Sequence, residues 1–184
     1  MKKPIIATLV TALIVFIYQA LSWMVLPIHN GSERYTPAQD TILSVVSSHL
    51  HEEGLYTLPN LPAGAAMSDR EALHTSMQGK PWMMLTYHPA WTVNMGTSMV
   101  GGFLLDLFSA ALLVWVLWSA STAFASFGAR FWVSTAFGVF TLLQSSLADW
   151  NWLSTPWHYT SGDVLDHLLA WALSGVWLGA YLKR

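Results

Sequence analysis

The sequence predicts an all-α membrane protein: a bundle of four transmembrane helices with both termini in the cytoplasm. A small α+β insert is expected outside the cytoplasm, between the first and second helices. Two observations support this prediction. The chain of 184 residues is 54% hydrophobic and only 10% charged, whereas soluble domains carry about 25% charged residues. It also contains 11 Trp, a residue that concentrates at membrane–water interfaces.

Four stretches come close to the roughly 20 apolar residues that a helix needs to cross the hydrocarbon core of a bilayer. The chain therefore divides into a first transmembrane helix (1–27), an extracytoplasmic αβ insert (28–97) and three further helices (98–184). A short aromatic outer loop is expected at 149–163 within the last part. The four predicted spans are residues 4–27, 98–119, 131–148 and 164–182.

The charges that flank these spans predict their orientation. With four spans, the basic residues Lys2, Lys3, Arg130, Lys183 and Arg184 all fall on one side of the membrane. The acidic residues Asp149, Asp163 and Asp166 fall on the other. Because basic residues mark the cytoplasmic side, segments 28–97 and 149–163 are predicted to be extracytoplasmic. We expect a bacterial inner membrane, with a periplasmic insert.

The insert carries signals for two short helices. Thr36, followed by Pro37, is expected to cap a helix that stops at Gly54. A second capping box at 68–71 predicts another helix that ends near Gly79.

Two extended stretches in the insert, 55–58 and 82–87, are expected to pair as a small sheet. A unit of this size buries little core of its own. We therefore expect it to lean on the helix ends or on a partner.

Asp106 is the leading candidate for a functional residue, because an ionisable group inside a span is costly and usually faces the bundle interior. Asp166, His167 and Gln144 are predicted at similar depth in the third and fourth spans, so the four side chains could meet in one polar pocket. Structural roles stay open. Asp106 could pin two helices together by hydrogen bonds, and Asp166 with Asp163 could cap a helix dipole.

The predicted outer loop is rich in aromatic residues. Trp150, Trp152, Trp157 and His158 are expected to anchor the chain at the interface. Such rings could also bind a quinone or a lipid headgroup. Gly175 and Gly179 form a G-x-x-x-G pattern that predicts close helix packing, either within the bundle or on a partner.

The sequence predicts no metal site. The weak candidates are His88, His158 and His167, but no spacing among the seven His matches a known metal motif. The chain has no Cys, which excludes disulfides, thiolate zinc sites and cysteine nucleophiles. Only His167 lies near enough to the bundle interior to ligate a haem. With a net charge of −2, the sequence shows no basic cluster of the kind that binds nucleic acid.

The first functional hypothesis is a non-enzymatic accessory or assembly subunit of a larger membrane complex, because we found no catalytic motif. Its partners would be the bilayer and another membrane protein or a second copy. The alternative is a membrane enzyme or redox protein whose polar pocket (Asp106, Asp166, His167) binds a proton, a metal or a quinone. A third is an oligomeric transporter or channel. No cofactor is assigned.

Overall fold

The computed structural model describes residues 2–183, and the chain forms two compact units. The first, here called the bundle unit, joins the chain up to Arg34 with the chain from Val93 onward. The second, here called the insert unit, is Tyr35–Thr92.

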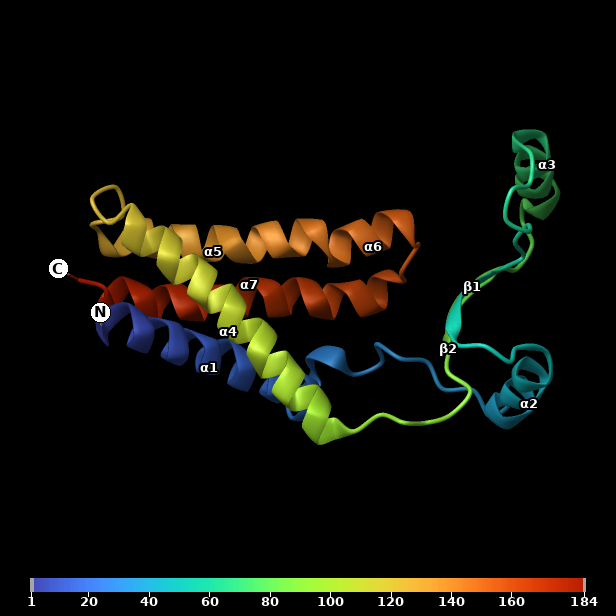
Figure 1. Cartoon of the computed structure of the whole chain (residues 1–184), viewed down its shortest axis with the longest axis horizontal. Coiled ribbons are helices and arrows are strands. Elements are labelled where there is room, and N and C mark those ends of the chain that lie inside the picture. Colours follow the sequence, from blue (N-terminus) through green and yellow to red (C-terminus); the bar gives the residue numbers. More distant parts are fainter. Residues whose placement is uncertain (1, 184) are drawn as a thin grey trace. The chain divides into compact units, whose positions relative to one another are not determined.

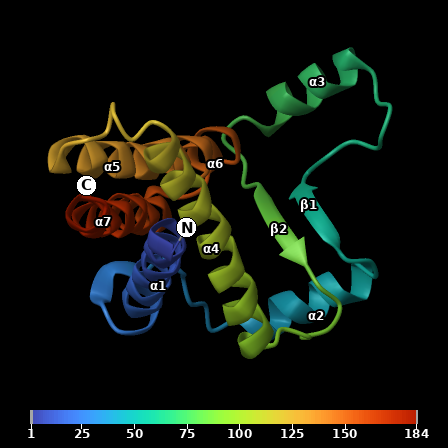
Figure 2. The same ribbon diagram turned by 60° about the vertical axis from the view of Figure 1, so that its left-hand side comes forward.

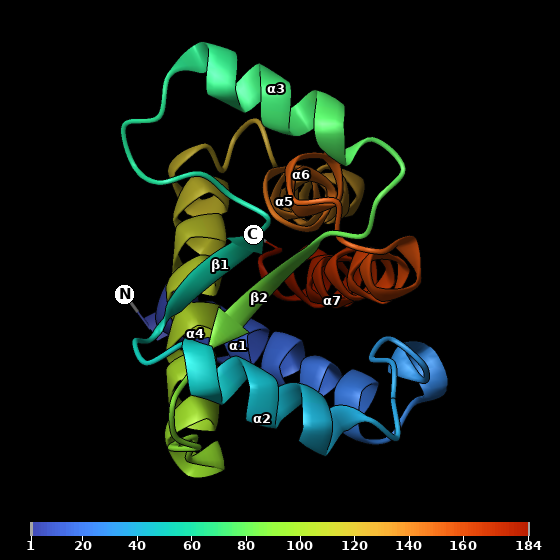
Figure 3. The ribbon, with the colours of Figure 1, turned by 90° about the vertical axis from the view of Figure 1, so that its right-hand side faces the viewer.

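The bundle unit is helical. Helices α5 and α7 lie side by side, α1 packs against α7, and α4 crosses α1 (Figure 1). Figure 3, which looks along α5 and α7, shows the same pair end on. The buried core lies where α1, α4, α5 and α7 meet. The elements are α1 (Lys2–Met24), the 3-10 turn η1 (Pro27–His29), α4 (Met95–Ser119), α5 (Phe127–Gln144), α6 (Ser146–Trp152) and α7 (Trp157–Tyr181).

Three helical segments in the described part of the chain are long and apolar enough to cross a membrane. They are α1, α4 and the continuous stretch Phe127–Trp152, which comprises α5 and α6. The predicted fourth span, 164–182, corresponds to most of α7, which is not among these three. Helix α7 is long enough, but Asp163, Asp166 and His167 make its first half polar.

Helices α5 and α7 approach closely because glycines line their contact. A Cβ atom on Gly138 of α5 would lie 2.5 Å from the backbone oxygen of His167. A Cβ atom on Gly175 would lie 3.0 Å from the backbone oxygen of Phe131, and one on Gly179 would lie 2.7 Å from the Phe127 ring. The close packing predicted from Gly175 and Gly179 is confirmed, and it occurs within the bundle.

A buried arginine joins the same two helices at the end where Gly179 packs on Phe127. Arg130 is 4% exposed, and its guanidinium donates to the backbone oxygens of Gly179 (3.2 Å) and Ala125 (2.6 Å). Gly179 lies in the last turn of α7, where unpaired carbonyls and the helix dipole favour a cation. The arginine thus fastens the start of α5 to the end of α7.

The insert unit holds two short helices and a two-stranded sheet. Its elements are α2 (Gln39–His49), β1 (Gly54–Leu58), α3 (Met67–Met77) and β2 (Met83–Tyr87). The strands are antiparallel, with Gly54 opposite Tyr87 and Leu58 opposite Met83 (Figure 2). The predicted pairing of two extended stretches is confirmed.

The predicted helix caps of the insert are wrong. Helix α2 begins at Gln39, because the Thr36 hydroxyl accepts a hydrogen bond from the nearby Ala38 N–H (3.3 Å) and so stabilises a local turn. It ends at His49, and Gly54 begins β1 instead of stopping the helix. Helix α3 begins at Met67, which places Ser68 inside the helix.

The predicted aromatic loop at 149–163 is mostly helical. Helix α6 continues to Trp152 and α7 already begins at Trp157. The connection is only residues 153–156, where Ser154 adopts a positive φ of 55°. Pro156 precedes the first turn of α7, a position that suits its fixed φ angle.

We predict that Gly138→Ala destabilises the bundle by about 1–3 kcal/mol, the usual effect of overpacking a tight contact. The added methyl would meet a backbone oxygen that cannot move without shifting α7. Thermal unfolding in detergent should show a lower Tm. Gly128→Ala is the matched control, because a Cβ there meets nothing within 4 Å and alanine favours the helix. Equal Tm values for the two variants would contradict the packing described.

Candidate functional site

A buried carboxylate on α7 joins three helical elements. After α1 ends, η1 carries the chain back toward α7 and places His29 Nε2 2.9 Å from Asp166 Oδ2. Ser22 Oγ donates to Oδ1 at 2.5 Å, and Tyr18 Oη donates to the same oxygen at 3.2 Å. Tyr18 and Ser22 stand four residues apart on α1, so they share one helix face.

Asp166 is thus a satisfied buried anion. Its exposure is 8%, and a carboxylate removed from water is costly unless it accepts several hydrogen bonds. The two oxygens accept three bonds, two from α1 and one from η1. This set orients Asp166 and fixes η1 to the bundle.

The ring of His29 is also in close contact with Trp23 and Gly162. Its ring stacks on Trp23, with centroids 3.7 Å apart and planes 11° from parallel. A Cβ on Gly162 would lie 2.7 Å from His29 Nδ1, so only glycine leaves room for the ring. Nδ1 is buried without a hydrogen-bond partner. The contact with Asp166 is therefore the only hydrogen bond of this ring within residues 2–183.

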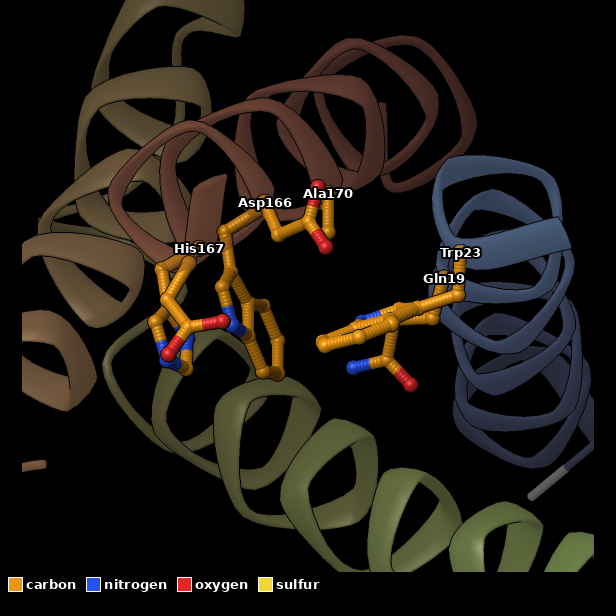
Figure 4. Close-up of a pocket in the computed structure, with 7 residues that line it drawn as sticks. Gln19, Trp23, Asp166, His167 and Ala170 are labelled. Carbon is orange, nitrogen blue, oxygen red and sulfur yellow. The ribbon is translucent and has the colours of Figure 1, made fainter. Parts of the chain in front are cut away.

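Asp166 also borders a cavity of about 300 Å³ between α1 and α7, here called the Asp166 cavity. Gln19 and Trp23 of α1 face Asp166, His167 and Ala170 of α7 (Figure 4). The complete lining is Gln19, Trp23, Asp163, Asp166, His167, Ala170 and Trp171.

His167 is held at this cavity by α5. Thr141 Oγ1 lies 3.3 Å from its Nδ1, and Ser145 Oγ lies 3.3 Å from its Nε2. Both hydroxyls donate to backbone oxygens, those of Gly138 (2.9 Å) and Thr141 (2.7 Å). A neutral imidazole carries one N–H, so it can donate to only one of these two hydroxyl oxygens at a time.

Asp106, on α4, contacts the lining residue Gln19. It is 7% exposed, and its carboxylate forms a hydrogen bond with the Gln19 side chain. The second oxygen, Oδ2, is buried without a partner. Because Gln19 also lines the cavity, one amide connects Asp106 to the site.

Two titratable groups lie in the first turns of α7, before the apolar stretch predicted from residue 164. Burial raises the pKa of the Asp163 carboxyl above its ordinary value, although His29 and His167 nearby oppose the shift. Burial also raises the pKa of Tyr159, with Asp163 as the next contributor. Both groups therefore favour their neutral forms more than exposed groups do.

The structure brings together only some of the predicted site residues. Asp166 and His167 line the cavity and Asp106 adjoins it, whereas Gln144 is exposed outside it. Asp163 and Asp166 do not cap α7, because the helix begins at Trp157 and has no acidic residue in its first turn. The predicted dipole role is therefore wrong.

Of the aromatic and metal candidates, only His167 lines the cavity. Trp150 packs edge-on against Trp157 with centroids 5.9 Å apart, and Trp152 and His158 are exposed. His88 belongs to the insert unit, where its Nδ1 lies 3.1 Å from Glu53. Within residues 2–183, no three His, Asp or Glu side chains gather as a metal-binding set.

Sequence reasoning missed the α1 and η1 side of the site. Tyr18, Gln19 and Ser22 are polar residues on one side of an otherwise apolar helix, a pattern that signals a buried polar contact. His29 had no local signal, because its partner is 137 residues away.

Comparison of the chain with family models, curated proteins and solved structures finds no match.

We predict that Asp166→Asn lowers the stability of the bundle by about 1–3 kcal/mol, the usual range for hydrogen bonds to a charged group. Asparagine keeps the shape but loses the charge and one acceptor. Asp149→Asn is the control, since Asp149 is exposed at the same end of the bundle. Unfolding in detergent, followed by Trp fluorescence, measures both variants. An unchanged midpoint for Asp166→Asn would show that the three hydrogen bonds contribute little.

Proposed function

We propose that the chain is a four-span membrane subunit that binds, or helps to assemble, a larger membrane complex through its insert unit. In this proposal both termini are cytoplasmic and the insert unit is periplasmic, in a bacterial inner membrane. The partner is another membrane protein.

The observation that carries the proposal is that no residue of the insert unit is buried. Two helices and a sheet form there without a core, although a folded unit normally needs one. Large apolar side chains of the insert unit are exposed. They are Tyr35, Ile42, Leu43, Val45, Leu55, Leu58, Met67, Trp82, Met83 and Trp91. A partner surface would cover this apolar area.

Three features support four crossings. Helix α7 has 25 residues, about 37 Å at 1.5 Å per residue, enough to cross the bilayer core. Its polar side chains Asp166 and Ser174 are buried, so they do not face lipid. Lys3 donates to the backbone oxygen of Lys183, and Arg130 donates to that of Gly179, so basic residues gather at the end of α7, as they do on the cytoplasmic side of a membrane.

The proposal predicts companion subunits in stoichiometric amounts. Native mass spectrometry of the protein, purified in mild detergent from its own membranes, should show at least one further chain. The double substitution Ile42→Ser, Val45→Ser should remove that chain, because both exposed side chains lie three residues apart on one face of α2.

Ser44→Ala is the control on the same helix and should retain the companion. A monomeric or homo-oligomeric mass for the unaltered protein would overturn the proposal. Retention of the companion by the double variant would place the contact elsewhere on the chain.

A second candidate function is chemistry or ligand binding in the Asp166 cavity. The observation that favours it is the convergence of Asp163, Asp166 and His167 on one cavity, with Asp106 adjoining through Gln19. A cavity with convergent polar groups is the usual form of a ligand site.

If the cavity is functional, Asp106→Asn should abolish activity in cells while the purified variant keeps its Tm. Asparagine can keep the hydrogen bond to Gln19 but cannot accept a proton. Complementation of a deletion strain, together with thermal unfolding, measures both effects. Full complementation by the folded variant would leave Asp106 with a structural role.

A further inference from the structure

Two carboxyl groups give the Asp166 cavity its acidic character. Asp163 and Asp166 both line it. His29, which contacts Asp166, is not part of the cavity lining. Even a protonated His167 would neutralise only one of the two carboxylates. Among residues 2–183, no Lys or Arg forms an ion pair with either aspartate.

The cavity is also partly aromatic. The indoles of Trp23 and Trp171 line it from α1 and α7. One face of Trp23 is covered by His29, yet the side chain is still 46% exposed. Indole rings attract cations placed over their faces, and Trp is the strongest of the aromatic side chains in this respect. Carboxylates beside indoles form a surface that suits a cation with an organic body.

The remaining lining residues limit the kind of cation. The cavity offers only two carboxylates and one imidazole, and no metal-binding set occurs within residues 2–183. The amide of Gln19 supplies one further polar contact. A volume of about 300 Å³ accommodates a ligand with a small organic body.

We propose that the Asp166 cavity binds the ammonium group of a small organic cation. Asp163 supplies the counter-charge, because an ammonium group bound beside a carboxyl group favours its charged form. Trp23 and Trp171 supply aromatic contacts, and Asp166 is the second carboxyl group of the lining. This inference rests on the second candidate function above and is independent of the insert unit. The ammonium group has two possible sources, a soluble amine or a lipid headgroup.

The test is isothermal titration of the full-length protein in phosphatidylglycerol nanodiscs with methylammonium, tetramethylammonium and choline. The neutral isostere of choline, 3,3-dimethylbutan-1-ol, is the ligand control. We expect saturable binding of at least one of the three cations and none of the neutral alcohol. Quenching of Trp fluorescence should accompany binding, because two indoles line the cavity.

Asp163→Asn should weaken this binding by about tenfold or more, the effect expected when a contact to a charged group is lost. Trp23→Phe, which keeps a ring, should weaken it less. Asp149→Asn removes an exposed carboxylate outside the cavity lining and should bind as the unaltered protein does. This control separates a specific site from the general negative charge at this end of the bundle.

Nanodiscs that contain phosphatidylethanolamine distinguish the two sources. If a headgroup amine occupies the cavity, the apparent affinity for the added cation should fall several-fold in these discs. Unchanged affinity would indicate a soluble amine.

Absence of saturable binding by all three cations would overturn the proposal. So would equal binding of choline and its neutral isostere, or equal losses in Asp163→Asn and Asp149→Asn. None of these results bears on companion subunits, which native mass spectrometry measures separately. If the cations fail to bind but Asp106→Asn still abolishes activity in the folded protein, the second candidate function stands with another ligand.

Discussion

The arrangement of the bundle depends on one buried carboxylate. Asp166 lies among apolar helices, where an unpaired charge would be prohibitively costly. Tyr18, Ser22 and His29 satisfy it, and this requirement fixes α1 and η1 against α7. The neighbouring cavity follows from the same arrangement, because Trp23, which stacks on His29, forms its wall on α1.

The contact between α5 and α7 depends instead on residues that have no side chain. Gly138, Gly175 and Gly179 allow the two backbones to approach, and Arg130 joins the helices at one end. The bundle therefore combines close glycine packing along α5 and α7 with polar contacts between α1 and α7. The insert unit has neither source of stability within itself, since none of its residues is buried.

Apolar length and composition were enough to predict the helical fold, because both are local properties of the sequence. They predicted the positions of α1, α4 and α5. The two extended stretches predicted the pairing of β1 with β2, and the G-x-x-x-G pattern predicted the glycine contact on α7. The predicted helix cap at Thr36 was wrong because a competing hydrogen bond forms nearby. The Thr36 hydroxyl accepts from the Ala38 N–H instead of capping α2. At the site, Asp166 and His167 were predictable as costly polar residues in an apolar helix, whereas His29 depends on a contact across 137 residues.

The central claim is that α7 crosses the membrane, with its polar half inside the bundle and the Asp166 cavity toward the periplasm. The chain has no Cys, so a single introduced cysteine is the only thiol that a labelling reagent can modify in this protein. Ser154→Cys and Lys183→Cys place thiols at exposed positions near either end of α7. Whole cells with a permeabilised outer membrane are treated with a membrane-impermeant maleimide. We expect the thiol at position 154 to be labelled. The thiol at position 183 should be labelled only after the inner membrane has also been opened. Labelling of both positions with the inner membrane intact would contradict a fourth crossing.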